Sequence, residues 1–422
     1  MRASLILPQT GPVLLALMCL AQGFSRGLFN TCYGLLVLWG IIWLAWGRRS
    51  WGVKVSPLPK AWVDGLTLLV LALFLTSAAG DLPYQSLKTS ARHLYVCAAA
   101  PLAWLALSHN PKVVGYMPYL YGLGLAGSGV VTFFEAGLCV QCVRAKGTLG
   151  TIELSGVLGQ IPPVLVGAMA AVAPRDKRKI AKIVFLLACL AASYAALRTN
   201  CGRIAIICAP LLMAVMFFAN LKKMAPWLIV ALVVPTLAGG VMLALDYKTA
   251  GRFGEMLLPA EDNLNNHQRF AYWRQGLEYF QAHPVLGAGP GAKPAPPEYS
   301  NGPGHYSHSH NIYLTFLSET GIVGLACFLI FLTAPIRLLW RFRKSPDALV
   351  FFWTWAAMVV FLQMALNGVT DFAFGNRVIA VLHLTVMGAA LWVAYGRLPE
   401  PGAAGRKTAA DNDAPKPGRA GA

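Results

Sequence analysis

Apolar runs of about the length of a bilayer core recur along almost the whole chain, and they constrain its fold more than any other feature. A helix of about 20 apolar residues crosses the hydrocarbon layer with every backbone polar group paired inside its own segment. The sequence therefore predicts an all-α integral membrane fold with about 12 transmembrane helices. The twelve candidate spans are residues 5–24, 29–46, 61–79, 93–108, 113–135, 155–173, 183–198, 203–220, 225–245, 311–334, 348–367 and 375–395.

Charge gives the orientation of these spans and excludes nucleic acid as a partner. The formal net charge is +18, although only 12% of the residues are charged. Lys and Arg cluster between the apolar runs, and 22 of the 35 fall on one side when the spans alternate from an inner N-terminus. Short inner loops of membrane proteins carry this excess of positive charge. We therefore expect membrane lipids, and no nucleic acid, around the chain, with the first span retained as a helix and not cleaved as a signal peptide.

Two segments depart from the pattern of short loops. Residues 246–310 form a long outer loop, in which Arg269 to Ala282 is predicted to be a helix that ends at His283-Pro284. Residues 397–422 combine Pro, Gly, Ala and charge without periodicity, which predicts a disordered cytoplasmic tail. The predicted organisation is a polytopic transmembrane domain at 1–396, which includes the loop 246–310, followed by the tail 397–422.

The strongest candidate for chemistry lies where the long loop meets the tenth span. His310 and Asn311 stand at that junction, and Gly321 and Gly324 follow inside the span. A neutral imidazole at a wet interface accepts a proton near neutral pH, which suits a general base. Asn311 either orients that ring or caps the helix, and the two glycines allow a neighbouring helix to approach closely. An interfacial histidine beside a helix-packing face is the alternative interpretation.

The spacing of these residues resembles a family motif. His310-Asn311, nine residues, then Gly-x-x-Gly resembles the motif of the O-antigen ligase family, membrane glycosyltransferases that attach lipid-linked polysaccharide to lipid A–core. Arg269-x-x-x-Trp273 and His283-Pro-Val-Leu-Gly-Ala-Gly289 resemble the loop segment that precedes the motif. The resemblance covers roughly residues 180–330, and its signature is shared with O-antigen polymerases and protein O-oligosaccharyltransferases.

The resemblance also implies which residues bind the substrate. In the family, two arginines are associated with the diphosphate of the donor, and Arg203 and Arg269 occupy their positions. Guanidinium is permanently charged and binds phosphate oxygens through paired donors. The surroundings Asn-Cys-Gly-Arg-Ile depart from the family's usual Ser-Arg-Gly and leave Arg198 as a rival to Arg203. His310 is then the catalytic base, and Arg203, Arg269 and Asn311 are the substrate-binding residues, with snorkelling interfacial anchors as the alternative for each arginine.

The reaction implied by the resemblance moves a glycan from undecaprenyl diphosphate to a sugar hydroxyl of lipid A–core. It takes place in the bacterial inner membrane with the active site facing the periplasm, so the long loop is periplasmic. It needs neither ATP nor a divalent cation, and we expect no cofactor and no metal site. The alternatives are an O-antigen polymerase or a protein O-oligosaccharyltransferase and, more distantly, a lipid or solute transporter. Few ionisable residues lie at mid-membrane depth, which argues against a translocation path.

Three further features carry weaker expectations. Glu319 lies inside the tenth span and is expected to form a structural hydrogen bond to another helix. Asp371 stands at the outer end of a span, where it either pairs with Arg377 or orients a catalytic group. The three histidines that end the long loop are candidate metal ligands by type, but the sequence offers no obvious acidic partner for them.

Overall fold

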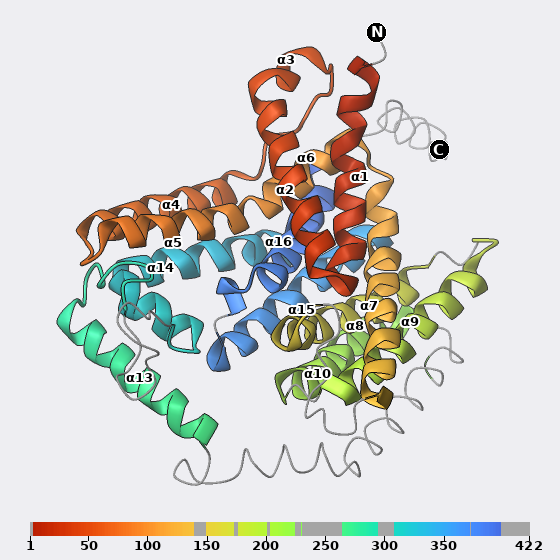
Figure 1. The fold of residues 1–422 in the computed structure, drawn as a ribbon. Coiled ribbons are helices and arrows are strands. Elements are labelled where there is room, and N and C mark those ends of the chain that lie inside the picture. The colour runs from red at the N-terminus through yellow and green to blue at the C-terminus, as the bar shows by residue number, and fades with distance from the viewer. Residues whose placement is uncertain are drawn as a thin grey trace, which may run out of the picture.

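The computed structural model describes residues 3–138, 149–172, 176–200, 203–223, 229, 264–293, 308–371 and 373–397 (Figure 1). All regular secondary structure among them is helical, and no strand occurs among them. The α-helices are α1 (Ala3–Phe24), α2 (Arg26–Ile42), α3 (Arg48–Ser50), α4 (Lys60–Ala79), α5 (Pro83–Cys97), α6 (Ala99–His109), α7 (Val113–Leu138), α8 (Thr151–Ala171), α9 (Lys179–Asn200), α10 (Arg203–Asn220), α13 (Leu264–Ala282), α14 (Ile312–Trp340), α15 (Ala348–Thr370) and α16 (Arg377–Leu391). The π-helical turns Trp43–Gly47 and Trp392–Gly396 extend α2 and α16.

Eight helices within the described residues are long and apolar enough to cross a membrane. They are Leu7–Phe24, Arg26–Ser50, Lys60–Ala79, Val113–Glu135, Ile152–Ala171, Ile312–Trp340, Ala348–Thr370 and Arg377–Gly396. Each coincides with one of the predicted spans, so the chain is a multi-pass membrane protein of all-α class.

The predicted number of twelve spans is not confirmed. The expected span 93–108 is divided between α5 and α6, which meet at Ala98. The expected spans 183–198 and 203–220 correspond to α9 and α10, of which α10 contributes only the shorter apolar stretch Ile207–Asn220. The expected span 225–245 lies outside the described residues, apart from residue 229, as does the predicted tail beyond residue 397.

The centre of the bundle is formed by α8 and α16. Their apolar windows are 83% and 89% buried, whereas those of α2, α4 and α14 are buried over less than half. Both central helices pack against α15, and α16 also packs against α6. A helix that is apolar on all sides can lie either inside a bundle or against lipid, so it is packing between helices that places these two at the centre. Gln160 of α8 donates a hydrogen bond to Gln363 of α15 at 2.9 Å and so links two of these helices.

The N-terminal helices form one side of the bundle. α1 packs along α2 and α7, and α7 also packs against α9 (Figure 1). Small residues permit the closest of these contacts, because a Cβ at Gly124 would collide with the backbone carbonyl of Leu20. Close approach of backbones at glycine is a common way for helices to pack in a membrane.

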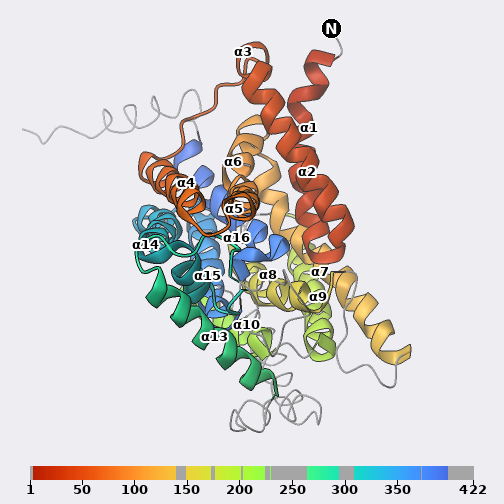
Figure 2. The same cartoon turned by 60° about the vertical axis from the view of Figure 1, so that its left-hand side comes forward.

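The opposite side carries α4, α5, α14 and α13. α4 packs against both α5 and α14, and α13 crosses α14 (Figures 1 and 2). A helix was predicted from Arg269 to Ala282; α13 ends at Ala282 as expected but begins five residues earlier, at Leu264. Of the predicted loop 246–310, the structure describes residues 264–293 and 308–310. Its periplasmic location stays a prediction.

Candidate functional site

α14 is broken at Gly321, one third of the way along its length. Gly321 has φ 63° and ψ −168°, a conformation that essentially only glycine adopts. A Cβ at this position would collide with the backbone carbonyl of Val285, and a Cβ at Gly287 would collide with the backbone of Glu319. The segment that approaches Gly321 closely is therefore the loop that follows α13. The sequence had predicted that a neighbouring helix would take this place.

The break leaves backbone groups of α14 without helical partners, and this loop supplies the missing partners. Orphan N–H and C=O groups at a helix end are costly inside a membrane unless another segment pairs them. Two loop carbonyls accept from the second half of the helix, and two loop N–H groups donate to the first half. The four bonds are Ile322 N to Pro284 O (3.0 Å), Val323 N to Val285 O (3.3 Å), Ala288 N to Ser318 O (3.2 Å) and Gly289 N to Glu319 O (2.8 Å).

Asn311 caps the start of α14, which is one of the two roles that the sequence suggested for it. The side-chain oxygen of Asn311 accepts a hydrogen bond from Leu314 N at 3.0 Å. Its Nδ2 donates to the carbonyl of Val369, near the end of α15, also at 3.0 Å. Both ends of the amide thus hold structure, since they cap α14 and tie it to α15. A contact between Asn311 and substrate stays a prediction.

His310 lies at the meeting point of α13, α14 and α15. Its φ is 47°, in the left-handed region that non-glycine residues seldom adopt. Its Nδ1 lies 3.7 Å from Oδ1 of Asp371. The centroid of its ring lies 4.4 Å from that of His308 and 5.5 Å from that of Tyr272. One third of the His310 side chain is exposed, so a substrate can reach it.

The two neighbours of His310 differ in their electrostatic setting. Burial, with a smaller contribution from the nearby His310, lowers the pKa of His308 from 6.5 to about 4, so His308 is neutral at neutral pH. Asp371 faces His310, which favours the role of orienting a catalytic group over the role of pairing with Arg377. Arg377 donates to Oδ1 of Asn30 at 3.2 Å.

A fully buried lysine contacts residues 308–310, which we call the histidine segment. Lys293 has no exposed surface, and its Nζ donates to Oγ of Ser309 at 3.0 Å. The same Nζ lies 5.6 Å from the ring centroid of Tyr272. Ser309 N in turn donates to Oγ1 of Thr315 at 3.1 Å. Lys293 therefore joins the glycine-rich loop to the residue that precedes His310.

Glu319 is the acidic residue whose attraction acts on this lysine. Burial lowers the pKa of Lys293 from 10.5 to about 8, and the attraction of Glu319 opposes that shift. Oε2 of Glu319 accepts a hydrogen bond from Gly291 N at 2.8 Å. Glu319 thus forms the structural hydrogen bond that the sequence suggested, but its partner is the backbone of the loop and not another helix.

The two candidate arginines are positioned by different helices. Arg269 is half-buried on α13, three residues before Tyr272 and seven before Gly276, so the three share one helical face. Tyr272 contacts His310 on that face, which places Arg269 one turn away from the histidine segment. Arg203 is the first residue of α10, and α10 packs against α15. That Arg203 and Arg269 converge on one diphosphate stays a prediction.

Sequence reasoning missed Lys293 altogether and left Asp371 undecided. Nothing in the local sequence marks Lys293 as buried, because a single lysine in a Gly- and Pro-rich loop is ordinarily a solvated residue. Asp371 and His308 provide the acidic partner and the second imidazole that turn His310 from one interfacial residue into part of a cluster. The arrangement can hold a base in a fixed orientation beside an accessible surface.

A comparison with protein families matches residues 183–329 to the model of the O-antigen ligase family. The matched segment runs from α9 into the second half of α14, and it includes His310, Asn311, Arg203 and Arg269. It therefore supports the family resemblance found in the sequence. None of the curated proteins compared with the chain matches it.

Proposed function

Because this chain carries the O-antigen ligase family segment, whose members are membrane glycosyltransferases, we propose that it transfers a glycan from undecaprenyl diphosphate to a sugar hydroxyl of lipid A–core. The transfer takes place on the periplasmic face of the bacterial inner membrane. The observation that carries the proposal is His310, held at the start of α14 with Asp371 beside Nδ1 and its ring partly exposed. This is the arrangement that a general base requires.

His310 removes the proton of the acceptor hydroxyl. With Nδ1–H directed towards Asp371, the lone pair of Nε2 is available to the hydroxyl, and Asp371 stabilises the imidazolium that forms. The acceptor oxygen bonds to the anomeric carbon as the bond from that carbon to the diphosphate breaks. Removal of a general base typically lowers a rate by about 10²- to 10⁴-fold.

Arg203 and Arg269 bind the diphosphate and stabilise the charge on the leaving undecaprenyl diphosphate. Two permanently charged guanidinium groups replace the charge neutralisation that a divalent cation would otherwise provide. The position of Arg269 one turn from Tyr272, beside the histidine segment, supports this role. The transfer then needs no metal, so activity that is abolished by a chelator and restored by a metal would contradict this version of the mechanism.

The first experiment is deletion of the gene in its native host, with gel analysis of the extracted lipopolysaccharide. Complementation uses wild type, His310→Ala and the matched control His283→Ala, which changes another partly exposed histidine that lies 3.7 Å from an aspartate. We expect core without attached repeats, polymer on the carrier lipid, and rescue by wild type and His283→Ala only.

The other outcomes of this experiment identify the alternatives. Core capped with a single repeat unit means that ligation is intact and that the protein is the polymerase. An unchanged profile removes both readings and directs the search to protein glycosylation and to transport. A transporter is also expected to tolerate His310→Ala, because it has no need of one interfacial imidazole as a base.

A further inference from the structure

Three metal-ligating side chains meet beside the proposed base. His308, His310 and Asp371 each offer one donor atom, and these atoms lie within 4.8 Å of one another. The donor atoms of His310 and Asp371 are 3.7 Å apart. Ligand atoms at about 2.0–2.1 Å from a tetrahedral Zn²⁺ lie roughly 3.3 Å apart. A movement of a few tenths of an ångström is therefore enough to bring this pair into coordination.

We propose that His308, His310 and Asp371 form a binding site for a zinc-like transition-metal cation whose occupancy blocks the base. Two imidazoles and one carboxylate are the donor set that such ions prefer, and a fourth position remains for water. The metal is an inhibitor of the chain and takes no part in the transfer. The inhibition rests on the proposed function, whereas the binding does not.

The block follows from the chemistry of a single imidazole ring. The nitrogen of His310 that faces Asp371 is Nδ1, so this is the atom that would ligate the ion. A neutral imidazole that ligates through Nδ1 carries its proton on Nε2. Binding thus moves the ring proton from Nδ1 to Nε2, where the base needs its lone pair. No proton is gained or lost, and the acceptor hydroxyl has no base.

The site is accessible, and its composition distinguishes it from a second pair of histidine and aspartate. The side chains of His310 and Asp371 are 33% and 24% exposed, so an ion can enter without unfolding the segment. His283 and Asp81 also lie 3.7 Å apart, but they form a pair without a second imidazole. No other group of three potential ligands occurs among the residues that the structure describes. The pair is therefore a matched internal control.

The binding test uses the purified full-length protein in detergent, titrated with Co²⁺ and then with competing Zn²⁺. We expect the visible absorption of a low-symmetry Co²⁺ centre, displaced by one equivalent of Zn²⁺. His308→Gln should weaken Zn²⁺ binding by at least about 100-fold, since loss of even an outer partner of a metal costs about 10- to 100-fold. Asp371→Asn should weaken it similarly, and His283→Gln should leave it unchanged.

Melting temperature and gel filtration show whether each variant is folded, and the wild-type Co²⁺ spectrum decides the point if His308→Gln fails to fold. The absence of saturable binding to wild type would overturn the proposal, as would equal affinity in a folded His308→Gln.

The inhibition test measures glycan transfer with increasing Zn²⁺. Inhibition of wild type that EDTA reverses, and that His308→Gln loses, supports the block, whereas binding without inhibition overturns that half. If no transfer is detected at all, the proposed function fails while the metal titration still decides the site.

Discussion

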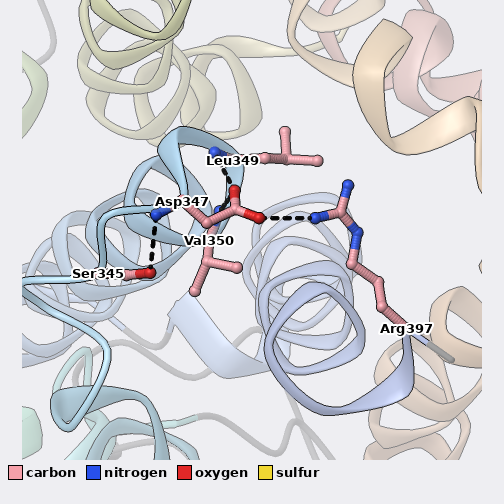
Figure 3. A network of polar contacts seen from close by, with 5 residues as sticks. All are labelled: Ser345, Asp347, Leu349, Val350 and Arg397. Atoms are coloured by element: carbon pink, nitrogen blue, oxygen red, sulfur yellow. Dashed lines mark hydrogen bonds and ion pairs between the residues drawn. The ribbon is translucent and has the colours of Figure 1, made fainter. Parts of the chain in front are cut away.

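The two aspartates that flank α15 have the same side chain and opposite settings. Asp347 precedes the helix, where its Oδ1 accepts two backbone N–H groups of the first turn at 2.8 and 3.1 Å (Figure 3). Its Oδ2 lies 3.2 Å from Arg397. Asp371 follows the helix, where the carbonyl ends of the backbone repel a negative charge. Its carboxylate faces His310 at 3.7 Å.

The surroundings of the two aspartates differ as well. A carboxylate at a helix N-terminus stabilises by about 0.3–1 kcal/mol, and the same group at the C-terminus costs a similar amount. The Asp371 end also holds a buried lysine, a histidine with positive φ and a helix broken at glycine. Such features persist where function requires them, since stability alone does not favour them. We infer that the Asp347 end of the α14–α15 pair serves the fold and that the Asp371 end serves chemistry.

The largest effect on stability is expected from Lys293→Met. The substitution removes the Nζ group that donates to Ser309 and attracts Glu319, and a buried polar group left without its partner costs about 1–3 kcal/mol, or more when it is charged. The measurement is the free energy of unfolding in detergent. The double variant Lys293→Met/Glu319→Gln should regain part of the loss, because no unpaired charge then remains. If Glu319→Gln lowers stability by the same amount in Lys293→Met as it does in wild type, the two groups do not interact.

The pH dependence of stability tests the direction in which burial shifts the pKa of Lys293. The pKa of Lys293 is about 8 in the folded protein and 10.5 for the free side chain, so the unfolded chain binds more protons between these values. Stability contributed by this group therefore rises as the pH increases from 8 to 10.5. Lys293→Met lacks the group, and its deficit relative to wild type should widen across this window. Parallel pH profiles of wild type and variant would contradict the burial of the lysine.

Gly321→Ala is expected to have the next largest effect. The side chain must adopt φ 63° with ψ −168°, and its Cβ must displace the carbonyl of Val285. Together these two terms cost about 3 kcal/mol. Gly52 is the matched control, since it has φ 65° but no atom within 4 Å of an added Cβ. Gly52→Ala should cost only about 1 kcal/mol, since its added side chain meets a positive φ but no neighbouring atom. Equal losses in the two variants would mean that the docked loop adds nothing to the requirement for glycine.

Local signals in the sequence predicted two of the boundaries around the site, the end of α13 and the start of α14, but not the start of α13 at Leu264. α13 ends before His283-Pro284 because proline cannot continue a helix, and α14 starts after Asn311 because its side chain caps the first turn. Hydropathy predicted the eight helices that are long and apolar enough to cross a membrane for an equally local reason, since each run is about as long as the bilayer core is thick.

Contacts between distant segments were beyond that reasoning. The pairing of His310 with Asp371 and the burial of Lys293 both depend on how α13, α14 and α15 pack, and no periodicity of a single segment contains that information. Hydropathy also treated residues 93–108 as one span, because the average over a window does not register the junction at Ala98. The two glycines of the family motif were visible in the sequence, but the loop that docks on Gly321 was not.

The smallest effects on stability, and the sharpest test of the comparison, are expected from the two aspartates themselves. Asp347→Ala removes a helix cap and should cost about 1 kcal/mol of unfolding free energy while glycan transfer is retained. Asp371→Asn removes a charge that the end of α15 disfavours, so stability should stay unchanged or rise by up to about 1 kcal/mol. Transfer by Asp371→Asn should nevertheless fall by about tenfold or more, because the amide no longer fixes the tautomer of His310. Melting curves and transfer rates of both variants check the two halves together. If Asp371→Asn lost stability and kept its rate, Asp371 would be a structural residue like Asp347, and the assignment of chemistry to this end of α15 would rest on His310 alone.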